Sequence, residues 1–201
     1  LPESGVPYWI SDSRMILSGR KNLYTSTDTG KTWTTVRYRT SIWEFTAFGQ
    51  LDSKTHLAGT QYDGLLLSRD GGKTWQQTSI GAGYEILALW VNQAVNPPQT
   101  ITLFEGSSVV SLATTKNTRA WEQIQTPCQN IGMYFQTIQS REGPIWQMQC
   151  VDPHALFILK PSISLDWIQV RLPENVRSFK DVVILEDGSI YLMISQCWPH
   201  T

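Results

Sequence analysis

One octapeptide occurs twice in this chain of 201 residues, and it constrains the fold more than any other feature of the sequence. Ser26-Thr27-Asp28-Thr29-Gly30-Lys31-Thr32-Trp33 returns as Ser68-Arg69-Asp70-Gly71-Gly72-Lys73-Thr74-Trp75, so both copies match Ser-x-Asp-x-Gly-Lys-Thr-Trp. Asp and Thr side chains accept or donate hydrogen bonds to nearby backbone groups, and Gly accepts a positive φ. The octapeptide therefore predicts a tight turn at two places in the chain.

Apolar residues precede both copies of the octapeptide, and a tryptophan ends each copy, as expected for two strands joined by a turn. Residues 23–26 and 65–68 suit strands that enter the turns, and the tryptophans open the returning strands with a large ring to bury. We interpret the two octapeptides as β-hairpins whose polar residues are structural rather than catalytic. The structural set is Ser26, Asp28, Gly30, Thr32, Trp33, Ser68, Asp70, Gly72, Thr74 and Trp75.

The tryptophans of the octapeptide set a register that extends over most of the chain. Trp33 and Trp75 are 42 residues apart, and Trp121 and Trp167 follow at intervals of 46. The segments before these later tryptophans, 114–121 and 160–167, lack the Asp and Gly of the motif, so their turns need another support. A period in the forties is typical of one four-stranded blade of a β-propeller.

The octapeptide resembles the Asp-box, or bacterial neuraminidase repeat, of β-propellers such as sialidases, sortilin-type receptors and photosystem II assembly factors. The resemblance implies an all-β fold, a small β-propeller with four-stranded antiparallel blades, with the motif turns at the rim away from the ligand face. We expect one domain over 1–201, with repeats at 8–40, 41–83, 84–130 and 131–175 and a partial repeat at 176–201. A five-bladed ring closed by N- and C-terminal strands is the expectation, and a four-bladed ring with an appended hairpin is the alternative.

Composition and charge argue against nucleic-acid binding and against a membrane-spanning helix. The formal net charge of −1 gives no electrostatic footprint for nucleic acid. No apolar run approaches the roughly 20 residues that a membrane-spanning helix needs. The chain begins Leu1-Pro2-Glu3-Ser4, without Met or a signal sequence. We therefore expect either a processed, secreted or periplasmic protein, or an engineered chain from which the leader was left out.

Three cysteines, Cys128, Cys150 and Cys197, leave at least one thiol outside any intrachain disulfide. Because Cys128 precedes a predicted strand pair that Cys150 closes, a disulfide between them is conceivable, and three reduced cysteines are the alternative. The sequence has no Cys-x-x-Cys and no pair of histidines at metal-binding spacing. No metal site and no cofactor are expected.

In propellers of this kind the ligand face is formed by loops between the second and third strands of a blade and by loops between blades. Applied to the predicted strands, the resemblance nominates the following residues for binding: Arg20, Lys21, Arg37, Tyr38, Arg39, Tyr62 and Asp63. The cations of the first repeat predict a positive patch for a carboxylate, a phosphate or an acidic protein surface. The alternative is a solvated rim of charges on strand edges, which opposes aggregation.

Three function classes follow from these features. A sialidase or another glycoside hydrolase is disfavoured, because six blades at this period need more than 201 residues and the arginines do not fall at the family's inner-strand positions. A lectin-like, glycan-binding propeller is disfavoured because the loops differ in length and composition between repeats. A non-catalytic, extracytoplasmic binding or scaffold protein, which presents its loops to a protein partner, is the expected function.

Overall fold

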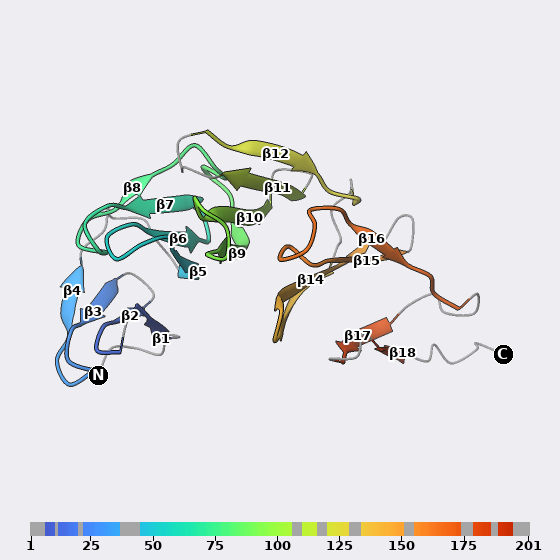
Figure 1. Cartoon of the computed structure of the whole chain (residues 1–201), viewed down its shortest axis with the longest axis horizontal. Helices are drawn as coiled ribbons and strands as arrows, with labels where there is room; N and C mark the ends of the chain where they lie inside the picture. Colours follow the sequence, from blue (N-terminus) through green and yellow to red (C-terminus); the bar gives the residue numbers. More distant parts are fainter. Residues whose placement is uncertain are drawn as a thin grey trace. The chain divides into compact units, whose positions relative to one another are not determined.

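Strands are the only regular elements in the part of the chain that the structure describes. The computed structural model describes residues 7–10, 12–19, 22–36, 45–105, 110–115, 120–128, 134–150, 155–173, 179–185 and 189–194. These described residues contain the strands β1 to β18, and the chain divides into two compact units, Leu1–Gln125 and Thr126–Thr201. Figure 1 shows the strands of both units in sequence colours.

Unit 1 contains three antiparallel four-stranded sheets, and in each of them neighbouring strands follow one another in sequence. The first sheet has the order β1 (Pro7–Trp9), β2 (Met15–Ser18), β3 (Leu23–Ser26) and β4 (Thr34–Val36). The second has the order β5 (Phe45–Gln50), β6 (His56–Thr60), β7 (Leu65–Ser68) and β8 (Gln76–Gln77). The third has the order β9 (Ile86–Asn92), β10 (Gln99–Glu105), β11 (Val110–Thr115) and β12 (Glu122–Gln125).

Unit 2 contains a fourth sheet of the same pattern and a two-stranded sheet. The fourth sheet has the order β13 (Tyr134–Ser140), β14 (Gly143–Cys150), β15 (Ala155–Leu159) and β16 (Ile168–Val170). The two-stranded sheet pairs β17 (Phe179–Ile184) with β18 (Ile190–Ile194). A disulfide joins Cys128 to Cys150 at a Cα–Cα distance of 5.4 Å.

Apolar residues from the first two sheets form a common core. A cluster of buried side chains combines Ile16 and Leu23 of the first sheet with Phe45 and Leu66 of the second. Burial of one aliphatic side chain of this size contributes about 1.5–3 kcal/mol. The Tyr8 ring of β1 stacks on the Phe48 ring of β5 with 5.4 Å between the ring centres. The first strands of the two sheets therefore lie side by side.

The second and third sheets approach closely because β5 and β6 each carry a glycine at the contact. A Cβ atom at Gly49 would lie 2.8 Å from Val91 Cγ2, and one at Gly59 would lie 2.6 Å from Ile86 Cγ2. The close approach also allows hydrogen bonds between sheets. The Thr46 hydroxyl donates to the Ile86 carbonyl at 2.6 Å.

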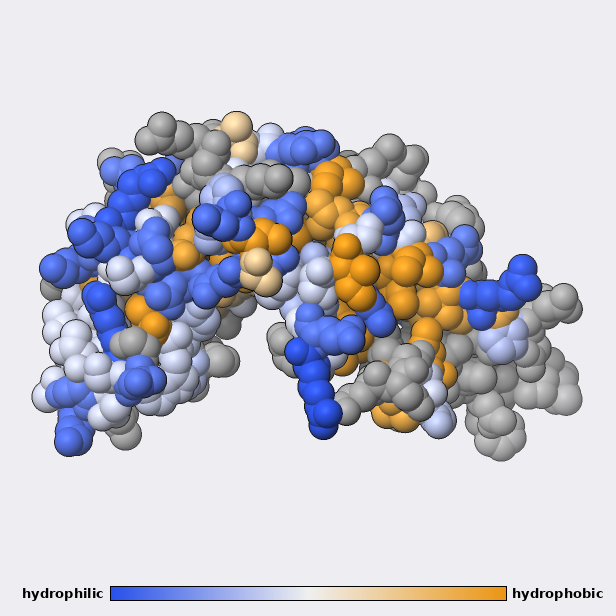
Figure 2. Space-filling view, in the orientation of Figure 1, coloured by the Kyte–Doolittle hydropathy of each residue, from blue (hydrophilic) through white to orange (hydrophobic). Residues whose placement is uncertain are grey.

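In unit 2, apolar side chains from β14 and β15 form a separate core. Ile145, Leu156 and Ile158 are buried, and Ile190 of the two-stranded sheet packs against them. Figure 2 shows hydrophobic residues gathered over the part of unit 2 that carries β15–β17. Large exposed apolar residues in this part of the chain lie in the strands and in the segments next to them: Ile163 between β15 and β16, Ile168 in β16, Val183 in β17, Leu185 after β17, and Tyr191 and Met193 in β18.

The strands predicted over 23–26 and 65–68 are observed as β3 and β7. The inner strand of the second sheet is described from Phe45 onward, as β5. The fourth strand of the second sheet, β8, is only Gln76–Gln77 long. Its pairing with β7 continues irregularly beyond Gln77, since Thr78 N–H bonds the Leu65 carbonyl and Leu65 N–H bonds the Ile80 carbonyl, and residues 79–84 form bends and turns. The all-β class and the four-stranded antiparallel sheets are confirmed.

Candidate functional site

Each octapeptide forms the turn between the third and fourth strands of its sheet, and one buried serine organises it. In the first turn, the Ser26 hydroxyl donates to Asp28 Oδ1 at 2.8 Å and accepts from Gly30 N–H at 2.8 Å. Asp28 in turn accepts hydrogen bonds from the Thr32 backbone N–H at 2.9 Å and from the Thr32 hydroxyl at 2.6 Å. Ser26 is 1% exposed, so the turn closes around its side chain.

The second turn repeats this hydrogen-bond pattern atom for atom. Ser68 donates to Asp70 Oδ1 at 2.9 Å and accepts from Gly72 N–H at 2.8 Å. Thr74 donates to Asp70 through its N–H at 2.9 Å and through its hydroxyl at 2.6 Å. The motif carboxylates are thus occupied in holding the turns.

The tryptophan of each motif folds back over its own turn. Gly72 lies between Trp75 and Ile16 of the first sheet, and Trp75 Nε1–H donates to the Gly72 carbonyl at 3.2 Å. Trp75 is buried in the core shared by the first two sheets, whereas Trp33 is half-buried over Gly30. The glycines have φ of +82° and +84°, a region that favours glycine.

The hydrogen bonds of the turns favour the charged form of both motif carboxyls. The hydroxyl and backbone N–H of Thr32, followed by the Ser26 hydroxyl, lower the pKa of Asp28 to about 2. At Asp70, partial desolvation acts in the opposite direction, but the hydrogen bonds from Thr74 and Ser68 outweigh it and lower the pKa to about 2. A general acid near neutral pH needs the opposite shift.

The fourth sheet holds its turn in another way, as its degenerate sequence predicts. Between β15 and β16, the N–H groups of Ile163 and Ser164 both bond the Lys160 carbonyl. The Ser164 hydroxyl then donates to Asp166 Oδ2 at 2.7 Å. In the third sheet, residues 116–119 of the corresponding turn lie outside the described residues.

Most of the residues nominated for ligand binding cannot be placed. Arg20, Lys21, Arg37, Tyr38 and Arg39 lie outside the described residues, so the predicted positive patch stays a prediction.

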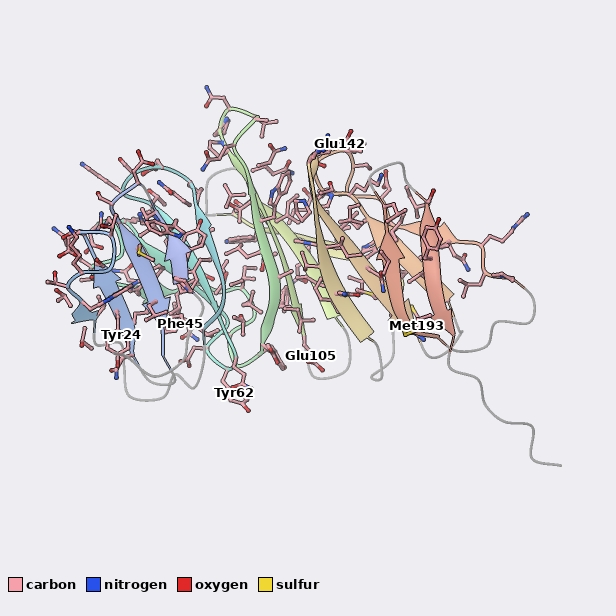
Figure 3. The ribbon with its side chains drawn as sticks, turned by 90° about the horizontal axis from the view of Figure 1, so that it is seen from below. Tyr24, Phe45, Tyr62, Glu105, Glu142 and Met193 are labelled. Atoms are coloured by element: carbon pink, nitrogen blue, oxygen red, sulfur yellow. A yellow bond between two sulfur atoms is a disulfide. The ribbon has the colours of Figure 1, made fainter. Side chains whose placement is uncertain are left out.

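Two of the nominated residues, Tyr62 and Asp63, lie in the turn between β6 and β7. Tyr62 is 53% exposed, and Figure 3 shows it projecting from one edge of the sheets of unit 1, the same edge as Glu105. This turn is at the opposite end of β7 from the motif turn 69–75.

Hydrogen bonds fix the backbone around Tyr62. The Thr60 N–H and hydroxyl both donate to the Gly64 carbonyl, at 3.0 and 2.7 Å. The Thr60 hydroxyl also accepts from the Asp63 N–H at 2.9 Å. The backbone of Gly64, with φ +69°, passes directly against the carbonyls of Ile80 and Gly81. Tyr62 therefore presents an aromatic ring from a well-fixed turn.

The segment before β9 extends the same edge toward the third sheet. Tyr84 is 39% exposed, and its N–H donates to the Gly81 carbonyl at 2.7 Å. Glu105 N–H donates to the Glu85 carbonyl at 2.9 Å, which joins the end of β10 to this segment. We call the surface formed by Tyr62, Asp63, Tyr84 and Glu105 the tyrosine edge.

Sequence reasoning missed one residue that supports a motif turn. Arg14, between β1 and β2, donates a hydrogen bond from its guanidinium to the Gly71 carbonyl, which connects the first sheet to the second turn. The sequence carried no signal for this contact, because the two residues are 57 positions apart and Arg14 belongs to no motif.

The described residues hold no candidate metal site and no helix that could cross a membrane. No group of three or more His, Cys, Asp or Glu side chains in the described part of the chain could hold a metal ion. The elements that the structure describes are strands, and none of them is a helix long and apolar enough to cross a membrane.

Comparison with known proteins gives relatives in structure only. No family model and no curated protein sequence matches the chain. A solved structure of YCF48 bound to D1 peptide is similar with a TM-score of 0.61 and 16% identity over 96% of this chain. The GH74 enzyme of Niastella koreensis is similar with a TM-score of 0.59 and 14% identity over 80% of this chain.

The chain spans 62% of the length of the YCF48 structure and 28% of that of the GH74 enzyme. At these identities the likeness concerns the fold alone. Together with the successive four-stranded antiparallel sheets, it supports a β-propeller fold for this chain.

Proposed function

We propose that this chain is a non-catalytic Asp-box β-propeller that binds a protein partner through the loops opposite its motif turns. The observation that carries the proposal is the contrast between the two ends of the strands in unit 1. At one end, the motif carboxylates are engaged in turn hydrogen bonds. At the other end, Tyr62 and Tyr84 expose aromatic rings from a fixed backbone.

Exposed tyrosines on rigid supports suit protein recognition. Tyrosine is enriched in protein interfaces, where it supplies a large contact area with few rotatable bonds. The likeness to YCF48, whose structure was solved with a bound peptide, agrees with a protein partner for this fold. The cations Arg20, Lys21, Arg37 and Arg39 add charge that would steer an acidic partner surface toward these loops.

A closed ring of five blades, with the β17–β18 hairpin as part of the fifth blade, belongs to this proposal. A compact chain of 201 residues has a radius of gyration of about 16–17 Å. Small-angle X-ray scattering separates a closed disc from an open arc, because the arc has a larger radius of gyration. A value well above that of a compact domain would contradict ring closure.

We place the protein outside the cytoplasm, in a secreted or periplasmic location. Disulfides persist in oxidising compartments and are rare in the cytosol, and the Cys128–Cys150 bond supports this placement. Detection of the oxidised form in a cell-envelope or culture-medium fraction tests it, and a fully reduced cytosolic protein would contradict it.

Capture of a partner from a cell-envelope extract tests the binding function. Tyr62→Ala with Tyr84→Ala should weaken capture roughly tenfold, since interface aromatics often contribute more than 1 kcal/mol each. Arg37→Glu with Arg39→Glu tests the predicted positive patch in the same assay. Lys73→Ala is the matched control, because Lys73 is exposed in the motif turn at the other end of β7.

The outcomes separate the parts of the proposal. Unchanged capture by the tyrosine variant removes the tyrosine edge as the binding surface. Unchanged capture by the arginine variant removes the positive patch and leaves protein binding standing. No captured protein from any extract contradicts the partner-binding function.

A carbohydrate-directed function is the second candidate, since the GH74 enzyme of Niastella koreensis has a similar fold. Glycoside hydrolysis needs two carboxyl groups about 5–10 Å apart across one sugar. Turnover of fluorogenic sialosides or other glycosides, abolished by substitution of an inner-strand carboxylate, would establish an enzyme. Retention on a glycan array without turnover would establish a lectin-like role.

A further inference from the structure

His56 is a buried polar side chain at the interface between the first two sheets. It is the first residue of β6, pairs with Gln50 and Ser68, and is 2% exposed. Strand side chains alternate between the two faces of a sheet. His56 therefore shares a face with Ala58, which lies in the core cluster that includes Ile10 and Ile16 of the first sheet. The imidazole faces the first sheet.

Neither ring nitrogen of His56 has a hydrogen-bond partner among the described residues. A buried polar atom without a partner costs about 1–3 kcal/mol, and an unpaired buried charge costs more. Burial of the ring therefore disfavours a second proton, although the backbone of Ser53 favours it.

Arg14 brings a positive charge from the first sheet to this place. Its guanidinium donates to the carbonyl of Gly71, whose N–H donates to the Lys54 carbonyl at 2.8 Å. A Cβ atom at position 71 would lie 2.8 Å from Arg14 Nη1, so the guanidinium packs directly against the Gly71 backbone. Nε of Arg14 is buried and has no partner among the described residues.

The charged groups around His56 come from three segments. They are Arg14 between β1 and β2, Asp52 between β5 and β6, and Asp70 in the motif turn. Burial first, and then the charge of Arg14, lower the pKa of His56. The Ser53 backbone and the carboxylates of Asp52 and Asp70 act in the opposite direction and are outweighed.

Both nearby carboxylates are already engaged. Asp52 Oδ1 accepts from the N–H groups of Lys54 and Thr55, at 2.7 and 2.8 Å. Asp70 accepts from Ser68, Lys73 and Thr74 in the motif turn. Proton uptake by His56 would therefore add a second positive charge to the buried region that holds Arg14, while the hydrogen bonds of both carboxylates are directed to other groups.

We propose that the contact between the β1–β4 sheet and the β5–β8 sheet is an acid-sensitive latch, which protonation of His56 beside Arg14 opens. The proposal concerns the integrity of unit 1 and is independent of the proposed partner-binding function. Opening moves Arg14 away from Gly71 and lets water reach the imidazolium.

The direction of the effect follows from proton linkage. His56 binds a proton less readily in the closed interface than in the open one, where its pKa is close to the ordinary value of about 6.5. The closed form is therefore fully favoured above that pH and loses stability as the pH falls below it. Within this window the opening equilibrium rises by at most tenfold per pH unit.

Hydrogen exchange of the whole chain at pH 7.5 and pH 5.0, corrected for intrinsic exchange rates, tests the latch. We expect the amides of β2, β3 and the turn at 69–74 to lose roughly tenfold or more of their protection at the lower pH. Strands β14 and β15 of unit 2 are the internal control and should keep theirs. His56→Gln should abolish the acid response, whereas His154→Gln, the same change elsewhere, should leave it intact.

Two results would overturn the latch. One is an equal loss of protection in β14 and β15, which indicates general acid unfolding. The other is an acid response that survives in His56→Gln. If that variant does not fold, the ring carbons of His56 are titrated by NMR in the unaltered protein. A native His56 that titrates at or above pH 6.5 contradicts the latch, and one that stays neutral well below that pH supports it.

Discussion

Ser26 and Ser68 are the residues on which the two motif turns depend. Each serine is 1% exposed, and its hydroxyl accepts from the backbone N–H of the motif glycine while donating to the motif aspartate. When a buried N–H group loses its acceptor, the folded state is destabilised by the full desolvation free energy of that group. Serine suits both positions because its hydroxyl accepts and donates at once, whereas alanine offers no acceptor.

Ser68→Ala should therefore lower the free energy of unfolding by about 1–3 kcal/mol, since it leaves the Gly72 N–H buried without an acceptor. Urea denaturation followed by tryptophan fluorescence measures the change. Ser79→Ala, at an exposed serine just after β8, is the matched control and should change stability by less than about 0.5 kcal/mol. Equal effects of the two substitutions would contradict the role of Ser68.

The motif aspartates should titrate far below ordinary carboxyl groups. NMR titration is expected to give a pKa of about 2 for both Asp28 and Asp70. Because folding lowers these pKa values, the stability that the carboxylates contribute is present above about pH 4 and is lost as the pH falls toward 2. Thr74→Val removes the hydroxyl donor and should raise the pKa of Asp70 while leaving that of Asp28 unchanged. No difference between the two sites in that variant would contradict the assignment.

At the scale of elements, two glycines decide how closely neighbouring sheets pack. Gly49 in β5 and Gly59 in β6 face Val91 and Ile86 of β9 at distances that no Cβ atom tolerates. The Thr46 hydrogen bond to the Ile86 carbonyl and the Gln93 hydrogen bond to the Gln50 carbonyl, at 2.6 and 2.8 Å, depend on that approach. The glycines thus act through sheet packing and not through backbone conformation.

Gly59→Ala should destabilise the protein by about 1–3 kcal/mol, because the new methyl group would overlap the side chain of Ile86. Gly83→Ala tests the specificity of this effect, since a Cβ atom at Gly83 meets nothing within 4 Å. That control has its own strain from a φ of +86°. A double-mutant cycle therefore combines Gly59→Ala with Ile86→Ala. The second substitution should recover part of the loss, and strictly additive effects would contradict a direct clash.

At the scale of the whole molecule, the Cys128–Cys150 disulfide links the segment before β13 to the end of β14. Both cysteines are 2% exposed. A disulfide across 22 residues restricts the unfolded chain and contributes about 2–4 kcal/mol. Such a bond suits a chain that works in an oxidising compartment.

Cys128→Ser with Cys150→Ser should lower the free energy of unfolding by about 2–4 kcal/mol. The measurement is urea denaturation in the absence of reductant, with Cys197→Ser as the control. The unaltered protein in reductant should match the double variant. If reductant leaves its stability unchanged, or if peptide mapping finds Cys128 and Cys150 as free thiols, the prediction is wrong.

The sequence alone determined the strands and their turns because these depend on local chemistry. The octapeptide at 26–33 and at 68–75 specifies its hydrogen bonds within eight residues, and short apolar stretches specify the strands that enter it. The spacing of the tryptophans then gave the four successive sheets, including the two whose turns have lost the motif.

Only the tertiary structure decided which distant residues meet. Nothing in the sequence places Arg14 on the Gly71 carbonyl, leaves the ring of His56 buried without a partner, or requires glycine at 49 and 59. These contacts depend on how neighbouring sheets twist and pack, and many side-chain choices satisfy the same strand pattern. The tyrosine edge likewise required the structure, since the turn of Tyr62 and the turn that precedes Tyr84 meet where the Gly64 backbone lies against the carbonyls of Ile80 and Gly81.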